Sequence, residues 1–172
     1  MKPSRKLLSS VIFFSMTSHL VQAASDITIS NQLNSDITGT SPFRDVTNNG
    51  GTSNLQVVTL VGALGTSNVV VTTNTAAGGA PFNGRLEVKD TITWGAANSL
   101  SLNADANIVI GATINSIGGG SLNLTSVGAV SFDADVTLIG APAGLSVNSL
   151  GVTQTESRKL LVDGFANIRM YS

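Results

Sequence analysis

Apolar and polar residues alternate through the middle of the chain, between residues 84 and 150. Leu86 and Val88 are separated by one polar residue, and Leu100 and Leu102 follow the same pattern. Alternation with a period of two is typical of a β-strand with one buried face, and no helical spacing competes with it there. The pattern predicts short strands separated by corners rich in Gly, Asn, Asp and Ala.

These predicted strands recur with a period of 22 residues. Three consecutive copies read GRLEVKDTITWGAANSLSLNAD, ANIVIGATINSIGGGSLNLTSV and GAVSFDADVTLIGAPAGLSVNSL. A shift of 22 places Leu86 over Ile108 over Val130, Val88 over Ile110 over Phe132, Ile92 over Ile114 over Val136, and Leu100 over Leu122. The third copy has one extra residue near Pro142, so Leu145 and Val147 are expected over Leu122 and Leu124 at a spacing of 23.

Self-similarity at a fixed period of this length predicts a solenoid. An extended coil of this length has a perimeter of about 70 Å at roughly 3.3 Å per residue, which suits one three-sided turn. A single coil is not stable alone, because its few inward side chains contribute only about 1.5 to 3 kcal/mol each against an ordering cost of about 1 to 2 kcal/mol per residue. We therefore expect an all-β fold, a three-sided parallel β-solenoid in which stacked coils share one interior.

The flanking segments follow the pattern less closely. Residues 69–73 alternate like residues 100–104, which lie 31 positions ahead, so a fourth coil is expected before the three clear ones, with a loop insertion at 74–83. Residues 55–64 are apolar enough for either a short helix or a buried strand. After the first 23 residues, the chain then divides into three regions. Residues 24–67 form an N-terminal capping or first-coil region, residues 68–152 form the solenoid repeats, and residues 153–172 form the last segment. The last segment is either a cap over the open sheet edge or a foreign tail created by truncation or a frame change.

Residues 1–23 have the three parts of a secretory signal peptide: a basic start, an apolar run and the final Val-Gln-Ala. We expect cleavage after Ala23 and export, to the medium or the cell surface, or to the periplasm if the chain is cut from a longer one. A membrane anchor is the alternative, but the apolar run is far shorter than the roughly 20 residues needed to span a bilayer. The mature chain has no other candidate span and carries four more acidic than basic residues, so nucleic acid is not an expected partner.

The chain offers few groups for catalysis. It has no Cys, and its only histidine, His19, lies in the predicted leader, which excludes Ser-His-Asp and Cys-His catalysis and the usual zinc ligand sets in the mature chain. Asp133 and Asp135 are a candidate calcium-binding or catalytic pair, but they fall over Gly111 and Thr113, so no acidic ladder forms and solvated corner residues are favoured. We therefore assign no catalytic residue, no cofactor and no metal site.

Three other patterns are interpreted as structural. Gly118, Gly119 and Gly120 resemble a phosphate-binding loop, but no Lys-Ser or Lys-Thr follows, so they are expected to form a corner. Trp94 falls over Ser116 and Leu138 at an inward position, and we expect it in the core beside a small neighbour rather than exposed as a platform for sugars. Outward residues do not repeat between copies, which argues against an ice-binding surface.

The sequence of residues 69–130 resembles the repeat region of filamentous haemagglutinin-type proteins, which are large exported adhesins of Gram-negative bacteria. The run VVVTTN, the glycine-rich loop, ITW, LSLNADANIVIGATI and GGGSLNL occur in the same order. The resemblance implies a right-handed parallel β-helix, an outer-membrane translocator as partner, and attachment to host cells or carbohydrate surfaces. The expected function is that of a non-enzymatic adhesin of this type, complete or truncated, and the alternative is a carbohydrate-active β-helix enzyme using carboxylates.

Overall fold

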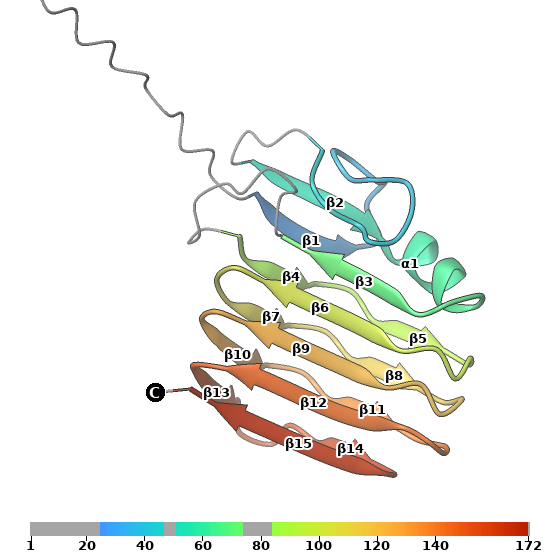
Figure 1. Ribbon diagram of the computed structural model, residues 1–172, viewed down its shortest axis with the longest axis vertical. Helices are drawn as coiled ribbons and strands as arrows, with labels where there is room; N and C mark the ends of the chain where they lie inside the picture. Colours follow the sequence, from blue (N-terminus) through green and yellow to red (C-terminus); the bar gives the residue numbers. More distant parts are fainter. Residues whose placement is uncertain (1–24, 47–50, 74–83, 172) are drawn as a thin grey trace, which may run out of the picture.

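The protein is a parallel β-solenoid in which successive coils stack along one axis, as a computed structural model shows (Figure 1). The structure describes residues 25–46, 51–73 and 84–171. It is nearly all-β, with about 22 residues per coil and one short helix in the described residues, which confirms the predicted fold class. The predicted leader, with His19, and the predicted loop at 74–83 lie outside the described residues.

Three parallel sheets form the three sides of the solenoid. Sheet 1 has the strand order β13-β10-β7-β4-β1-β2, with β1 Asp26–Ser30, β2 Thr52–Gln56, β4 Leu86–Val88, β7 Ile108–Ile110, β10 Ala129–Phe132 and β13 Gly151–Gln154. Sheet 2 has the order β14-β11-β8-β5, with β5 Ile92–Trp94, β8 Ile114–Ser116, β11 Val136–Leu138 and β14 Leu160–Val162. Sheet 3 has the order β15-β12-β9-β6-β3, with β3 Val69–Thr72, β6 Leu100–Ala104, β9 Leu122–Ser126, β12 Gly144–Ser149 and β15 Phe165–Met170.

The predicted register of the central coils is confirmed. Leu86 pairs with Ile108 and Ile108 with Val130, and the columns that begin at Val88, Ile92 and Leu100 follow the same shift. Leu145 pairs with Leu122, as the extra residue in the third copy requires. The spacing of 31 is also correct, because Val69 pairs with Leu100. Alternate side chains therefore form continuous buried columns inside the tube.

The stretch at 55–64 contains both of the alternatives that its sequence left open. Leu55 is a buried residue of β2, and helix α1 follows directly at Val57–Leu64. The helix connects sheet 1 to sheet 3, which is the path that a strand of sheet 2 takes in each later coil. It packs against β5, the edge strand of sheet 2, through buried Val57, Leu60 and Leu64. One face of helix α1 thus covers the N-terminal edge of sheet 2.

The first strand does not lie at the end of its sheet. β1 pairs with both β2 and β4, so the later strand β2 forms the outer edge of sheet 1. The segment between them returns over sheet 3, where Phe43 makes a parallel bridge to Val71 and is 1% exposed. This arrangement needs contacts across 59 residues, between Ile27 and Leu86, which no repeat period indicates.

Residues 151–171 form a further coil of three strands, β13, β14 and β15, each parallel to its neighbour in the preceding coil. The boundary expected after residue 152 falls inside β13. The coil is hidden in the sequence because its spacings differ: Val130 pairs with Val152, 22 positions on, but Val136 pairs with Leu160 and Leu145 with Ala166, which are 24 and 21 positions on. A uniform shift of 22 residues would place Val136 over the charged Arg158, so the apolar repeat cannot be recognised in this part of the sequence.

Candidate functional site

The outer face of sheet 1 carries a depression near its N-terminal edge. Ile27 and Ile29 of β1 point into the tube, so Asp26, Thr28 and Ser30 lie towards the other face. In β2, Leu55 is likewise buried, and Thr52 and Asn54 lie towards the outside. The strand alternation therefore places short hydroxyl and amide side chains of two neighbouring strands side by side.

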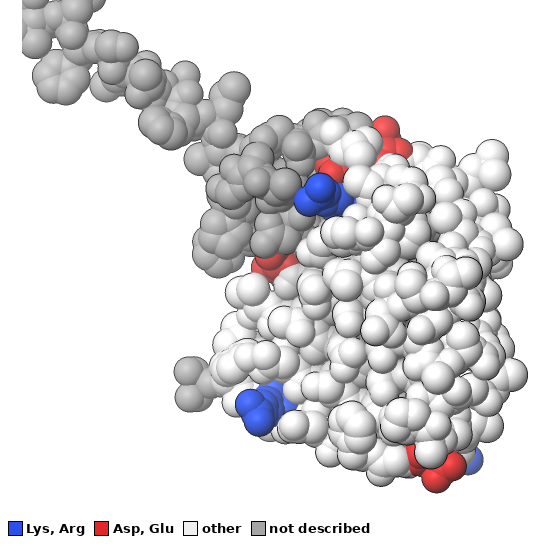
Figure 2. Space-filling view, turned by 45° about the vertical axis from the view of Figure 1, so that its right-hand side comes forward, with Lys and Arg blue, Asp and Glu red and all other residues white. Residues whose placement is uncertain are grey.

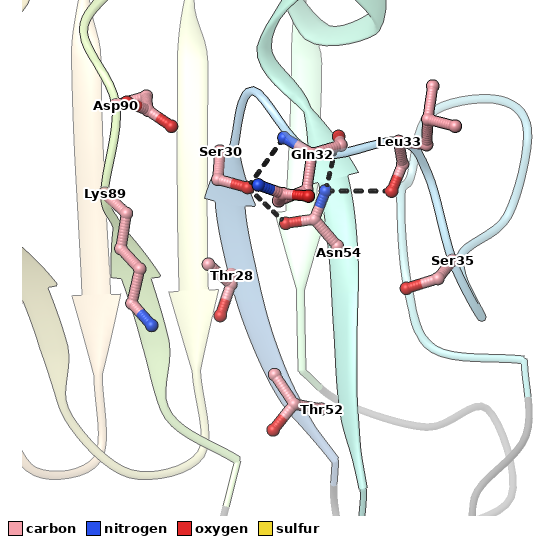
Figure 3. Close-up of a pocket in the computed structure, with 9 residues that line it drawn as sticks. All are labelled: Thr28, Ser30, Gln32, Leu33, Ser35, Thr52, Asn54, Lys89 and Asp90. Atoms are coloured by element: carbon pink, nitrogen blue, oxygen red, sulfur yellow. Dashed lines mark hydrogen bonds between the residues drawn. The ribbon is translucent and has the colours of Figure 1, made fainter.

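A groove with a cavity volume of about 580 Å³ lies over these side chains. Lys89 and Asp90, which follow β4, lie on one side of it, and the loop after β1 forms the other side (Figure 3). The residues that line this contact groove are Thr28, Ser30, Gln32, Leu33, Ser35, Thr52, Asn54, Lys89 and Asp90. Its volume lies within the range of about 300 to 1,000 Å³ that is common for small-ligand sites.

Hydrogen bonds hold the walls of the contact groove in place. Asn54 is central, because its Nδ2 donates to the carbonyl oxygens of Gln32 and Leu33 at 2.8 and 3.1 Å, and its Oδ1 accepts from Ser30 Oγ at 2.7 Å. The backbone N–H of Gln32 donates to Ser30 Oγ at 3.1 Å. On the other side, Asp90 Oδ2 accepts from the backbone N–H of Asn31 at 2.8 Å. The groove is therefore preorganised without a ligand.

Charged side chains line a smaller depression of about 160 Å³ beside the contact groove. Glu87 pairs with Arg85 at 3.2 Å and with Lys89 at 3.5 Å, and Asp26 Oδ1 accepts from the backbone N–H of Arg85 at 2.8 Å. These carboxylates are occupied by structural contacts. Because the ion pairs are partly exposed to water, each contributes little to stability.

Asp133 and Asp135, the candidate acidic pair, hold corners of the solenoid. Asp133 accepts hydrogen bonds from Ser131 Oγ at 3.1 Å and from Thr155 Oγ1 in the next coil at 2.7 Å. Asp135 accepts from the backbone N–H of Lys159 at 3.0 Å. Within the described ranges, no group of three or more His, Cys, Asp or Glu side chains is placed to hold a metal ion.

The other residues singled out from the sequence lie in the core and at a corner. Trp94 is 2% exposed, pairs with Ser116, and donates from Nε1 to the Asn98 carbonyl at 2.9 Å, so the inward prediction is confirmed. The three glycines from Gly118 form the corner between β8 and β9. Gly119 has a φ of 85°, and a Cβ there would lie 2.7 Å from the Ala141 carbonyl oxygen of the neighbouring corner. The positive φ and the close approach of the neighbouring corner both require a residue without a side chain at position 119.

Charged residues make up only 11% of the chain. Figure 2 shows a face on which charged side chains gather towards the two ends of the stack and leave a broad uncharged area between them. Among the described residues, no helix has the length and hydrophobicity needed to cross a bilayer.

The contact groove itself was not predicted from the sequence. The alternation of Thr28 and Ser30 with buried isoleucines indicates outward hydroxyls, but the pairing of β1 with β4 joins residues that are far apart in the chain. The fold and this groove define the class of protein as a parallel β-solenoid with a preorganised polar groove on one side. No protein-family profile, curated protein or solved structure matches the chain.

Proposed function

We propose that this protein is an exported, non-enzymatic attachment protein of the filamentous haemagglutinin type, and that the contact groove on sheet 1 binds carbohydrate. The observation that carries the proposal is the contact groove over β1 and β2, where Thr28 and Thr52 present hydroxyl groups beside walls that Ser30 and Asn54 hold in place by hydrogen bonds. Ser, Thr, Asn and Gln side chains both donate and accept hydrogen bonds, as the hydroxyl groups of a sugar do. Leu33, which is 78% exposed at the rim, adds an apolar contact for the C–H face of a sugar ring.

A binding role is favoured over carboxylate catalysis by the contacts of the acidic residues. Asp26 and Asp90 each accept a backbone N–H, and Glu87 lies between two cationic side chains. A glycosidase needs two carboxyl groups that are free to reach opposite sides of one glycosidic bond. Incubation of the purified chain with polysaccharides should release no reducing sugar, and measurable release would favour the enzyme alternative.

The export part of the proposal rests on the leader-like sequence of residues 1–23 and on the resemblance of residues 69–130. In this interpretation an outer-membrane translocator delivers the mature chain to the cell surface or the medium, where it contacts host cells or matrix. Mass spectrometry of the chain recovered from an exporting bacterium should give an N-terminus at Ala24. Recovery of the chain with an intact leader from the cytoplasm would contradict export.

Binding is tested with an immobilised panel of neutral and acidic oligosaccharides. The double variant Thr28→Val, Thr52→Val removes two hydroxyls from the groove but keeps β-branched side chains in both strands. We expect affinity to fall about tenfold or more, because each lost hydrogen bond contributes about 1 kcal/mol.

The matched control is Thr137→Val, which makes the same change on β11 in sheet 2, away from the groove. It should bind like the unmodified protein. Failure of the unmodified protein to bind any sugar on the panel, or equal losses in both variants, would contradict the assignment of the groove.

A further inference from the structure

The corner between sheets 3 and 1 carries a second depression, which shares no lining residue with the contact groove. Three of its residues directly follow strands of sheet 3: Asp105 follows β6, Val127 follows β9 and Leu150 follows β12. We call this depression the corner hollow. It has a cavity volume of about 270 Å³ and is lined by Asp105, Ala106, Asn107, Val127, Gly128 and Leu150.

Most of the lining of the corner hollow is apolar. Val127 and Leu150 are 50% and 56% exposed, so both side chains are available for contact with another molecule. Ala106 and Gly128 contribute almost no side-chain volume, which keeps the space beside the larger side chains open. Apolar side chains that are exposed together at one place favour contact with an apolar group.

Hydrogen bonds fix the backbone around the corner hollow. The Gly128 N–H donates to the Ala106 carbonyl at 2.9 Å, and Ser126 Oγ donates to the same oxygen. Asn107 Oδ1 accepts from the Ala129 N–H at 2.8 Å. A Cβ at position 128 would collide with Asn107 Oδ1, so a glycine is required there. The hollow therefore has its shape before any ligand binds, which lowers the cost of binding.

Among the described residues that line the corner hollow, Asp105 is the only ionisable one. Its backbone N–H donates to Thr73 Oγ1 at 2.9 Å, but no described group donates a hydrogen bond to its carboxyl oxygens or forms an ion pair with them. Arg85, in the adjacent coil, is engaged by Glu87 at 3.2 Å. Burial raises the pKa of the Asp105 carboxyl group, because desolvation disfavours the charged form. The carboxylate thus lacks the partner that a partly buried charge needs.

We propose that the corner hollow binds a small organic cation, an ammonium group on an apolar body, whose nitrogen pairs with Asp105 and whose hydrocarbon part packs on Val127 and Leu150. An unpaired carboxylate beside apolar side chains matches both halves of such a molecule. Charge-assisted hydrogen bonds are roughly twice as strong as neutral ones, and partial removal from water strengthens them further. An anion would be repelled by the carboxylate, and a Ca²⁺ ion needs about six or more oxygen ligands, which one carboxylate does not supply.

Binding is tested on the purified chain with cyclohexylmethylamine as the probe. Cyclohexylmethanol is the matched compound, because it has the same hydrocarbon ring and carries no charge. Titrations are followed in NMR spectra through the backbone N–H signals of Ala106, Asn107 and Gly128. We expect the amine to bind about tenfold more tightly than the alcohol, since a hydrogen bond to a charged group contributes more than a neutral one. No binding of the amine, equal binding of both compounds, or shifts confined to signals elsewhere would overturn the proposal.

Substitutions separate the two halves of the corner hollow. Asp105→Asn keeps the shape of the side chain and removes its charge, so the affinity for the amine should fall about tenfold while that for the alcohol stays unchanged. Leu150→Asn removes an apolar contact and should weaken both compounds alike. Asp163→Asn is the matched control, because it neutralises an exposed carboxylate at the corner after β14 and should change neither affinity. Equal effects of Asp105→Asn and Asp163→Asn on amine binding would contradict the assignment.

The affinity for the amine should also depend on pH. An alkyl amine stays protonated far above neutral pH, as lysine does with its pKa of about 10.4, whereas Asp105 loses its proton as the pH rises through its raised pKa. The affinity for cyclohexylmethylamine should therefore increase from acid to neutral pH, and that for cyclohexylmethanol should show no such increase. An affinity for the amine that does not change with pH would overturn the pairing with Asp105.

Discussion

Ser116 is the least typical residue of the buried columns. It is fully buried between Trp94 in one coil and Leu138 in the next, and within the described residues its hydroxyl has no hydrogen-bond partner. An unsatisfied buried hydroxyl costs about 1 to 3 kcal/mol. The small side chain lies directly beside the bulky, buried Trp94 of the adjoining coil.

Replacing the hydroxyl should therefore stabilise the protein. Ser116→Ala keeps the small volume and removes the unpaired group, so the free energy of unfolding measured in urea should rise by about 1 kcal/mol. Ser116→Leu is the comparison: it should lower stability by about 1 to 3 kcal/mol because the site beside Trp94 is already filled. A loss of stability in the alanine variant would show that the serine hydroxyl makes a contact that the structure lacks.

Asp105 makes stability depend on pH. It follows β6 at a corner, and partial burial raises the pKa of its carboxyl group above the ordinary value because desolvation disfavours the charged form. The folded chain thus holds this proton more tightly than the unfolded chain does. The contribution of Asp105 to stability is highest below the ordinary pKa of about 3.9 and declines as the pH rises through the folded-state value.

Asp105→Asn removes this dependence. At neutral pH the variant should be more stable than the unmodified protein, and the difference should vanish in acid, where the carboxyl group is protonated in both states. Thermal unfolding measured from acid to neutral pH checks this. A difference that stayed constant from acid to neutral pH would contradict this origin of the effect.

At the scale of the elements, the helix shows how position overrides residue preference. Residues 57–64 read VVTLVGAL, which is rich in the β-branched residues that favour strands. Nevertheless they form α1, because β5 has no further strand beside it at this end and the row Val57, Leu60 and Leu64 covers it. Asn98 Nδ2 donates to the Leu64 carbonyl at 2.7 Å and fixes the helix end to the corner after β5.

Gly62 weakens this helix and is open to improvement. It is exposed, and a Cβ at this position would meet no heavy atom within 4 Å. Gly62→Ala should therefore raise the free energy of unfolding by roughly 0.5 to 1 kcal/mol, since glycine is the poorer helix former. If residues 57–64 formed a strand in solution, the alanine would give no such gain, and the helical signal in circular dichroism would not increase.

The elements also show what the sequence could and could not predict. The columns through Leu86, Ile108 and Val130 follow one spacing, and their register could be predicted to the residue. The last coil could not, because insertions and deletions at its corners shift Leu160 and Ala166 out of the common period. The contact groove was missed for a related reason: it depends on β1 lying between β2 and β4, and no local pattern encodes that order.

At the scale of the whole molecule, the hydrophobic interior extends along the stack, and each coil contacts only its neighbouring coils. In such a quasi-one-dimensional fold, stability is close to a sum of coil and interface contributions. Deleting residues 130–151 joins Ala129 to Val152, which takes the place of Val130 in register, so β13, β14 and β15 can stack directly on β7, β8 and β9. Trp94 keeps Ser116 as its neighbour, and both ends keep their own strands.

The shortened chain should therefore retain its β-type circular dichroism and unfold cooperatively, with a smaller dependence on denaturant because less surface becomes exposed. Deleting only residues 130–140 is the control: it removes half a coil, brings corners over strands and should abolish cooperative unfolding. Equal behaviour of the two deletions would mean that register between coils does not determine stability. A full-coil deletion that fails to fold would mean that the coils are not interchangeable units, contrary to the period on which the architecture rests.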